Sequence, residues 1–276
     1  MTKQAKSRPK TATRKADGKA DARAEGTRLH VLIARAGQCS RREAERLIAA
    51  GEVQVNGKVV TEAGARAREG VDHVRVSGRL LHGAAKLRYY AYHKPVGCVS
   101  TLRDPERRFC IGDVVRALAM PGLFPVGRLD FHSSGLLLLT NDGGLAQQLT
   151  HPSFHVEKRY AVKASPRPSR EAIEMLRAGV RLRGVVTAPA YVRELRHGGG
   201  KSWIDVRISE GRNQQIRRMF EAVGSNVEKL RRESIGRLEL GDLEVGDVRR
   251  LTQSEVSALK SASPPANPRA PRVSAR

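Results

Sequence analysis

The spacing of apolar residues changes several times along the chain, and each stretch of regular spacing predicts a short helix or strand. Helices are predicted at residues 29–33, 41–48, 145–149, 170–178 and 213–223. Strands are predicted at residues 53–59 (as a hairpin), 87–92, 136–139, 160–162, 204–208, 227–230 and 237–240. After residue 87 the strands outnumber the helices and do not alternate strictly with them. This order favours an α+β fold with a mixed, mainly antiparallel sheet.

Residues 28–82 have the pattern of a separate small domain. Gly37 ends the first helix, Ser40 and Glu43 form a capping box that opens the second, and Gly51 closes it. An Asn-Gly pair then stands between alternating valines, which is a strong signal for a β-hairpin. We therefore expect two short helices followed by a hairpin.

The second of these helices carries three arginines on the side away from its apolar residues. Arg41, Arg42 and Arg46, with Lys58 on the hairpin, could lie along an RNA backbone, although an ordinary solvated helix face explains them equally well. The order Ala-Arg-Ala-Gly, Cys-Ser-Arg-Arg-Glu-Ala-Glu, Gly-Glu-Val and Val-Asn-Gly-Lys resembles the small RNA-binding domain named for ribosomal protein S-four. His30-Val31 departs from that pattern, where relatives often place a polar residue and a lysine.

The most informative stretch of the second predicted domain, residues 87–255, is 126–142. Its four consecutive leucines, 136–139, are typical of a strand covered on both faces, and Asp130 stands in a loop just before them. A carboxylate beside such a core needs a cation or hydrogen-bond donor, and Arg128 is the first candidate. A purely structural Arg-Asp pair is the alternative reading of these two residues alone.

The longer string, Gly-Arg-Leu-Asp followed by Ser-Gly-Leu-Leu-Leu and Thr-Asn-Asp-Gly, resembles the signature around the catalytic aspartate of RNA pseudouridine synthases. The whole layout resembles the RsuA-type ribosomal RNA pseudouridine synthases over residues 28–255. The resemblance implies the same α+β fold, with Asp130 as the catalytic carboxylate. It also implies that Tyr160 stacks on the target base, although a tyrosine entering a strand is most often part of a core.

Apolar residues Ile216, Met219, Phe220 and Val223 predict the buried face of a helix. The arginines between and before them would point away from that face, and their plain reading is a charged surface. Residues 211–219 resemble the family motif Gly-Arg-x-x-Gln-Ile-Arg-Arg-Met. In that family the motif supplies a cation that pairs with the catalytic aspartate, here Arg217, and an aliphatic residue beside the tyrosine, here Ile216. Gln214 stands where relatives often have Arg or His. The candidate RNA-binding residues are Arg41, Arg42, Arg46, Lys58, Lys158, Arg212 and Arg218.

Conversion of uridine to pseudouridine is an isomerisation with no net redox change or hydrolysis, so no cofactor or metal is expected. A uridine in folded RNA must first leave its stack, and an inserted Arg128 with the Tyr160 ring would offset that cost.

Composition supports a polyanionic partner. The chain has 276 residues with 39% hydrophobic content, enough for one larger and one smaller domain, and a formal charge of +23. Residues 1–26 and 261–276 are expected to be a disordered basic arm and a disordered tail. No apolar run suits a membrane span, and three cysteines without C-x-x-C spacing suggest neither disulfides nor zinc. We expect a cytoplasmic monomer that does not act at a membrane.

Ribosomal RNA, free or in an assembly intermediate, is the expected partner, and the motifs favour the large-subunit RNA over the small-subunit RNA. A noncatalytic RNA-binding or ribosome-assembly protein is the main alternative. A DNA-binding regulator would need a recognition helix. A hydrolytic nuclease would need clustered acids or histidines, and Asp130 has no second acid nearby in its motif.

Overall fold

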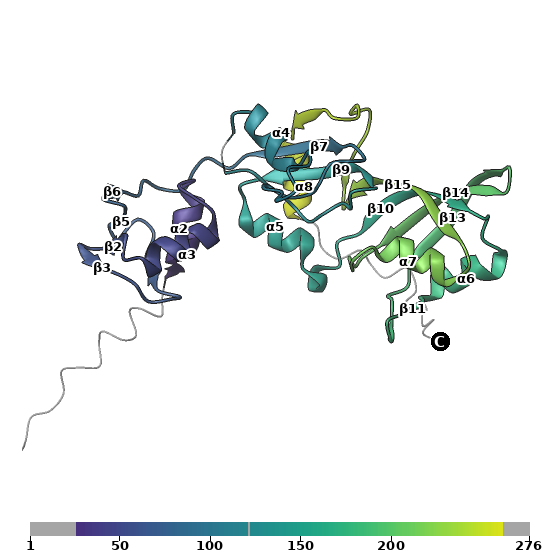
Figure 1. The fold of residues 1–276 in the computed structure, drawn as a ribbon, viewed down its shortest axis with the longest axis horizontal. Helices are drawn as coiled ribbons and strands as arrows, with labels where there is room; N and C mark the ends of the chain where they lie inside the picture. The colour runs from purple at the N-terminus through teal and green to yellow at the C-terminus, as the bar shows by residue number, and fades with distance from the viewer. Residues whose placement is uncertain (1–25, 121, 262–276) are drawn as a thin grey trace, which may run out of the picture. The chain divides into compact units, whose positions relative to one another are not determined.

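The computed structural model describes residues 26–120 and 122–261 (Figure 1). The two segments predicted to be disordered lie outside the described residues, apart from Gly26 and Ser261. The chain divides into two compact units between Ala85 and Lys86, and each unit is considered by itself.

The first unit packs two helices against short strands. Its elements are β1 (Thr27–Arg28), α2 (Leu29–Arg35), α3 (Arg41–Ala49), β2 (Val53–Val55), β3 (Lys58–Val59), β4 (Arg66–Ala67), β5 (Val74–Val76) and β6 (Arg79–Leu80). β3, β2, β5 and β6 form an antiparallel sheet in that order, and β1 pairs with β4. The predicted helices and hairpin are confirmed. The Ser40 hydroxyl accepts a hydrogen bond from the Glu43 amide at 3.2 Å, but the Glu43 carboxylate pairs with Arg46.

The second unit is built on one large mixed sheet. Its strands are β7 (Tyr89–Lys94), β8 (Phe124–Pro125), β9 (Ser134–Thr140), β10 (Lys158–Ser165), β11 (Arg181–Leu182), β12 (Val185–Val186), β13 (Tyr191–Gly198), β14 (Lys201–Ile208), β15 (Asn226–Ile235), β16 (Leu238–Glu239) and β17 (Val248–Arg250). The main order is β13-β14-β10-β15-β9-β7-β17, and only the β15–β9 pair is parallel among these. The predicted α+β class with a mainly antiparallel sheet is confirmed.

Helices lie on both faces of this sheet. They are α4 (Ile111–Ala117), α5 (Gly143–Thr150), α6 (Arg170–Ala178), α7 (Gln215–Ala222) and α8 (Gln253–Lys260), with a single 3-10 turn at Pro152–Phe154. Figure 1 shows α5 and α8 beside the β7–β9 half, and α6 and α7 beside the half that contains β13 and β14. In the described residues no helix is long and apolar enough to cross a membrane.

β9 is covered on both faces, as its leucines predicted. All four, residues 136–139, are fully buried, and alternate leucines belong to two different cores. Leu137 and Leu139 pack in the core that contains α7, whereas Leu136 and Leu138 pack with residues of α5 and α8. The strand therefore joins the two cores of this unit, and the loop before it is anchored to both.

Gly135 allows β15 to lie against β9. A Cβ atom at this position would stand 2.3 Å from the carbonyl oxygen of Arg232, and the Gly135 φ of +109° is unfavourable for other residues. Because no side chain intervenes, the two backbones approach closely at the point where Arg232 enters the site described below.

Several elements were not predicted from the sequence, and α4, β13 and α8 are the longest of them. α4, β13 and α8 have weak local patterns, and α8 continues past residue 255, where the domain was predicted to end. α8 begins at a capping box between Thr252 and Glu255, and Arg249 donates two hydrogen bonds to the Glu255 carboxylate at 2.7 and 2.9 Å. These contacts, with burial of Val256 and Leu259, stabilise a helix whose own sequence is only weakly amphipathic.

Candidate active site

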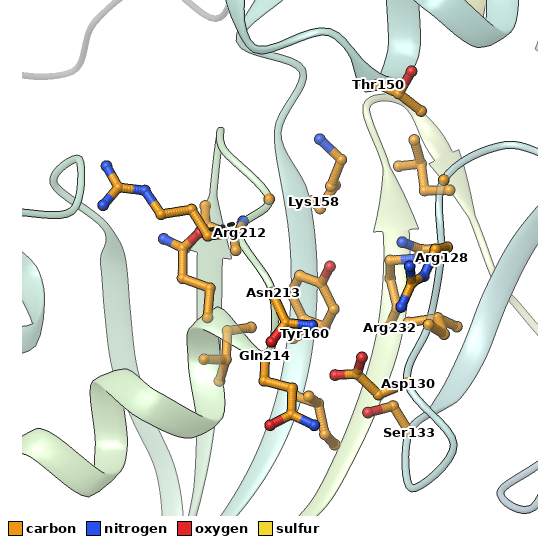
Figure 2. Close-up of a pocket in the computed structure, with 18 of the residues that line it drawn as sticks. Arg128, Asp130, Ser133, Thr150, Lys158, Tyr160, Arg212, Asn213, Gln214 and Arg232 are labelled. Atoms are coloured by element: carbon orange, nitrogen blue, oxygen red, sulfur yellow. Dashed lines mark hydrogen bonds between the residues drawn. The ribbon is translucent and has the colours of Figure 1, made fainter. Parts of the chain in front are cut away.

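A pocket of about 350 Å³ lies in the second unit, between the loop 126–133, strands β10 and β15, and the loop that enters α7. Figure 2 shows Arg128, Asp130 and Arg232 along one wall and Gln214 on the other, with Tyr160 between them. The sequence places these residues in four separate segments. Asp130, Tyr160, Arg128, Ile216, Lys158 and Arg212 are the predicted site residues that line this pocket.

The backbone of the Asp130 loop is fixed by hydrogen bonds on both sides of the aspartate. Ser100 Oγ donates to the Leu129 carbonyl at 2.6 Å and accepts from the Leu129 amide at 3.1 Å. On the other side, the Gly97 amide donates to the Phe131 carbonyl at 2.8 Å. Asp130 itself is only partly buried. Its position is therefore set by its neighbours in the loop, which leaves its carboxylate available to a substrate.

Arg217 contacts the backbone of this loop, whereas the sequence resemblance implied an ion pair between Arg217 and Asp130. Its guanidinium donates to the carbonyls of His132 and Val227, both at 2.8 Å, and within the described residues it forms no ion pair with Asp130. Through these two hydrogen bonds, Arg217 links α7 to β15 and to the loop. Both acceptors are backbone oxygens. Arg128, the other predicted partner, is exposed at the pocket and likewise forms no ion pair with Asp130 in the part of the chain that is described.

Lys94, at the end of β7, is hydrogen-bonded to the Asp130 loop. It is fully buried, and its ammonium donates to the carbonyls of Ser133 and Pro95, both at 2.8 Å. The Ser133 amide in turn donates to the Asp130 carbonyl at 3.0 Å. Burial lowers the pKa of Lys94 from 10.5 to about 8, although the nearby Asp130 carboxylate partly offsets this fall. Lys94 thus supplies positive charge beneath Asp130.

Arg232 supplies a second buried charge. It is 3% exposed, its Nε donates to the Leu136 carbonyl at 2.7 Å, and its Nη2 has no hydrogen-bond partner among the described residues. The register pairs Arg232 with Tyr160 on the neighbouring strand, and both side chains line the pocket. A buried donor without a partner is costly, and a substrate oxygen would satisfy it.

Lys158 lines the same pocket from β10. Its ammonium donates to the Val156 carbonyl at 2.9 Å, and burial, followed by repulsion from Arg232, lowers its pKa to about 8. Positive charge from Lys158, Arg232 and Arg128 therefore surrounds a pocket with one carboxylate, Asp130. Such a pocket attracts the phosphates of a nucleic acid.

The wall opposite Asp130 is a loop held by one glutamine. Gln215 accepts from the Arg212 amide at 2.9 Å and donates to Glu210 at 2.6 Å, while Glu210 also accepts from the Ala188 amide at 3.0 Å. Gln214, next to it, has a φ of +50° and faces the pocket (Figure 2). These bonds fix the entrance to α7, where Ile216 contributes an apolar surface to the pocket.

The remaining predicted residues do not line this pocket. Arg218 does not line the pocket itself but donates at 2.9 Å to Asn213, which does. In the first unit the candidate RNA contacts are all exposed, and one of them, Arg46, pairs with Glu43. Those exposed residues are Arg41, Arg42, Arg46 and Lys58.

Three residues around Asp130 were not predicted from the sequence: Ser133 and Arg232, which line the pocket, and the buried Lys94. Lys94 lies beyond the predicted strand 87–92, and Arg232 lies beyond the predicted strand 227–230, whereas the structure extends β7 to Lys94 and β15 to Ile235. A lysine directly after the apolar residues of a strand was the one available signal for Lys94. In the described residues, no group of three or more His, Cys, Asp or Glu side chains is arranged to hold a metal ion.

Comparison with known proteins identifies the family. A family model described as RNA pseudouridylate synthase matches residues 88–222, and one described as S4 domain matches residues 27–76. A ribosomal large subunit pseudouridine synthase B of Bacillus subtilis is 43% identical over 236 residues, which cover 85% of this chain and 96% of that protein. An uncharacterised RNA pseudouridine synthase of Aquifex aeolicus is 34% identical over 85% of this chain and 94% of its own.

A solved structure agrees with these sequence matches. The crystal structure of a pseudouridylate synthase superposes with a TM-score of 0.61 at 34% identity, covering 84% of this chain and 99% of that one. The predicted resemblance is thereby confirmed in both units. Since the matches extend over the segments that build the pocket, the chain belongs to the RNA pseudouridine synthase family.

Proposed function

We propose that this pseudouridine synthase isomerises a uridine of ribosomal RNA, with Asp130 as the catalytic carboxylate and without a cofactor. The position of Asp130 carries this proposal, because a carboxylate on a braced loop faces a cation-lined pocket and Tyr160. The Bacillus subtilis relative, which is named for the large ribosomal subunit, supports large-subunit RNA as the substrate.

The reaction exchanges one bond to the ribose for another. The bond between C1′ and N1 of the uracil breaks, the ring turns, and C1′ bonds to C5. The C5 proton is lost and N1 gains a proton, so atoms and electrons balance without an external oxidant or water. Asp130 either adds to the ribose carbon or to the ring, or accepts a proton along the way.

The pocket residues have distinct roles in this proposal. Tyr160, 8% exposed, offers a ring face to the flipped uracil, and Ile216 packs at the same pocket. Arg128, exposed at the mouth, can occupy the space that the flipped base leaves. Arg217 acts as a positioning residue through the His132 carbonyl. Asp130 and Tyr160 would therefore contact the substrate directly, whereas Arg217 would not.

The first test uses the wild type, Asp130→Asn, and the matched control Asp242→Asn, which changes an exposed aspartate outside the pocket. Each protein is incubated with unmodified small- and large-subunit ribosomal RNA, and pseudouridine is mapped by carbodiimide-blocked primer extension. We expect one new stop in the large-subunit RNA with the wild type and the control, and none with Asp130→Asn. Tight binding by all three without modification of either RNA would favour the noncatalytic RNA-binding alternative.

A further inference from the structure

The sheet of the second unit has a face that the pocket does not use. Along β10, Tyr160 and Val162 are buried on the side of the pocket and the α7 core, so Arg159, Ala161 and Lys163 point to the opposite side. In β13 the side chains of Tyr191 and Leu195 are 44% and 48% exposed. Within the described residues, these exposed fractions leave this part of the sheet open to solvent.

The strand register gathers positive charge on this face. Arg159 pairs with Arg207, Ala161 with Arg231, and Lys163 with Lys229 on the strands to either side. We call the resulting surface the basic sheet face. Its charged members are Arg159, Lys163, Arg193, Arg196, Lys201, Arg207, Lys229 and Arg231, with the acids Asp205, Glu228 and Glu233.

The acids on the basic sheet face are already neutralised. Asp205 is 1% exposed and accepts from Arg159 at 2.9 Å and from Arg207 at 3.3 Å. Glu228 lies 3.3 Å from Lys163 and 2.5 Å from Lys201. Eight cations against three acids leave an excess of five positive charges, and the excess is still three when the marginal acids are included. Those marginal acids are Glu157 and Glu239.

Three cations of this face have no acidic partner in the described part of the chain. Arg193 and Lys229 are exposed, and Arg196 lies over the Trp203 ring at 5.7 Å. A solvated outer face of a sheet normally mixes both charges, so an excess of this size calls for a polyanion.

Aromatic rings lie among these charges. The Arg207 guanidinium lies 4.6 Å from the centre of the Tyr191 ring, and Arg196 covers Trp203 in the same way. Trp203 lines two adjoining hollows of about 530 and 490 Å³, whose other walls include Arg231 and Lys163. Cations that track a backbone beside rings that can stack on bases are the usual elements of a surface for single-stranded nucleic acid.

We propose that the basic sheet face is a second RNA-binding surface, which holds a single-stranded segment of the RNA whose uridine occupies the pocket. This proposal rests on the proposed RNA substrate. RNA fits the charge excess and the rings together, whereas an acidic protein would satisfy the charge alone. The sheet is one layer thick, so a strand of RNA that leaves the pocket can pass around its edge to reach this face.

Trp203 makes the surface directly observable, because it is the single tryptophan of the chain. The probe is an oligouridylate of about 15 nucleotides, close to the upper site size of one stacking platform. We expect saturable quenching of Trp203 fluorescence and protection from acrylamide, in the wild type and equally in Asp130→Asn. Poly-glutamate of equal charge should not quench. Absence of quenching at saturating RNA, or equal quenching by poly-glutamate, overturns the proposal.

A matched pair of double variants tests the cations. Arg193→Gln with Lys229→Gln removes two cations of the face, whereas Arg170→Gln with Arg250→Gln removes two exposed cations elsewhere in the same unit. For two phosphate contacts, the salt dependence of oligouridylate affinity should become shallower by about 1.4 in log-log slope, since each contact contributes about 0.7 on single strands. The control pair should change the slope by less than half of that.

Turnover separates this surface from the catalytic pocket. The Arg193 and Lys229 double variant should modify a minimal stem-loop carrying the mapped uridine at the wild-type rate. Equal slopes for the two double variants, or a loss of stem-loop turnover that matches the loss of binding, overturns a separate surface. If no RNA is modified by any protein but Trp203 is still quenched, the proposed reaction fails while the RNA surface stands.

Discussion

Replacing Lys94 by methionine separates the electrostatic role of this residue from its role in packing. The charged form is held in the folded protein at a cost, because the pKa falls from 10.5 to about 8, which corresponds to about 3 kcal/mol at pH 7. Methionine is free of this cost but leaves the carbonyls of Ser133 and Pro95 without a donor, at roughly 1–3 kcal/mol each. The two effects oppose each other, so urea unfolding at pH 7 should give a stability within about 3 kcal/mol of the wild type.

Catalysis should respond quite differently. Without the ammonium, the Asp130 loop loses its lower anchor and the carboxylate loses a nearby positive charge, while Arg232 remains. A displacement of about 1 Å in a catalytic group can cost about a hundredfold. We expect kcat in single-turnover assays to fall by about that factor for Lys94→Met, with RNA affinity changed less than threefold.

The pH dependence of kcat tests the charge of Lys94 more directly than the size of kcat at one pH. The groups that face Lys94 are Asp130 and Cys98, which raise its pKa, and Arg232, which lowers it. Wild-type kcat should fall as the pH rises through about 8, because Lys94 loses its proton there, whereas the low kcat of Lys94→Met should show no such step. Because the folded-state pKa lies below the unfolded value of 10.5, wild-type stability should also rise between pH 8 and 10.5 relative to the variant.

Lys158 has a similar pKa and must be distinguished from Lys94. The variant Lys158→Met should weaken RNA binding and leave the pH step in kcat in place, because Lys158 lies in the pocket wall and not beneath the Asp130 loop. Wild-type kcat that stays constant to pH 9.5, or a Lys94→Met variant with wild-type kcat, would refute the reasoning.

Three further substitutions test the fold around the site. Gly135→Ala places a Cβ 2.3 Å from the backbone of Arg232 and should destabilise the protein by more than about 3 kcal/mol in urea unfolding. The control Gly184→Ala, with a similar positive φ but open space, should cost only about 1–2 kcal/mol, and equal losses would contradict the close approach. Arg217→Met removes two backbone contacts and should lower kcat about a hundredfold with nearly unchanged RNA affinity; a variant whose binding falls as much as its kcat would count against a positioning role. Ser40→Ala should lower the stability of the first unit by about 1 kcal/mol, measured by amide hydrogen exchange of α3, and unchanged protection would show that the cap contributes nothing.

Local pattern alone determined much of this fold. The leucine run predicted a strand buried on both faces, the glycines and Ser40 marked the ends of the first helices, and Asn56-Gly57, with φ values of 51° and 79°, formed the expected turn. The sequence also predicted the Asp130 loop, because a polar stretch directly before a buried strand is typical of a loop. Such features depend on neighbours within a few residues, so a single sequence contains them.

Tertiary structure decided which groups surround Asp130. The loop is held by Arg217, whose contact at His132 is 85 residues away, and Arg232 reaches Leu136 across 96 residues. Sequence resemblance paired Arg217 with the aspartate, but the backbone carbonyls of the loop and of β15 take up its guanidinium.

Tertiary structure also decided the burial of Lys94 and the charge of the basic sheet face. A lysine after a strand gives no sign of being fully buried until the loop folds over it, and the charge of β13, β14, β10 and β15 gathers on one face only through their register. Periodicity along the chain determines which side of each element is buried. Only the pairing of distant strands determines which charges meet, because that pairing is chosen by the packing of the whole core.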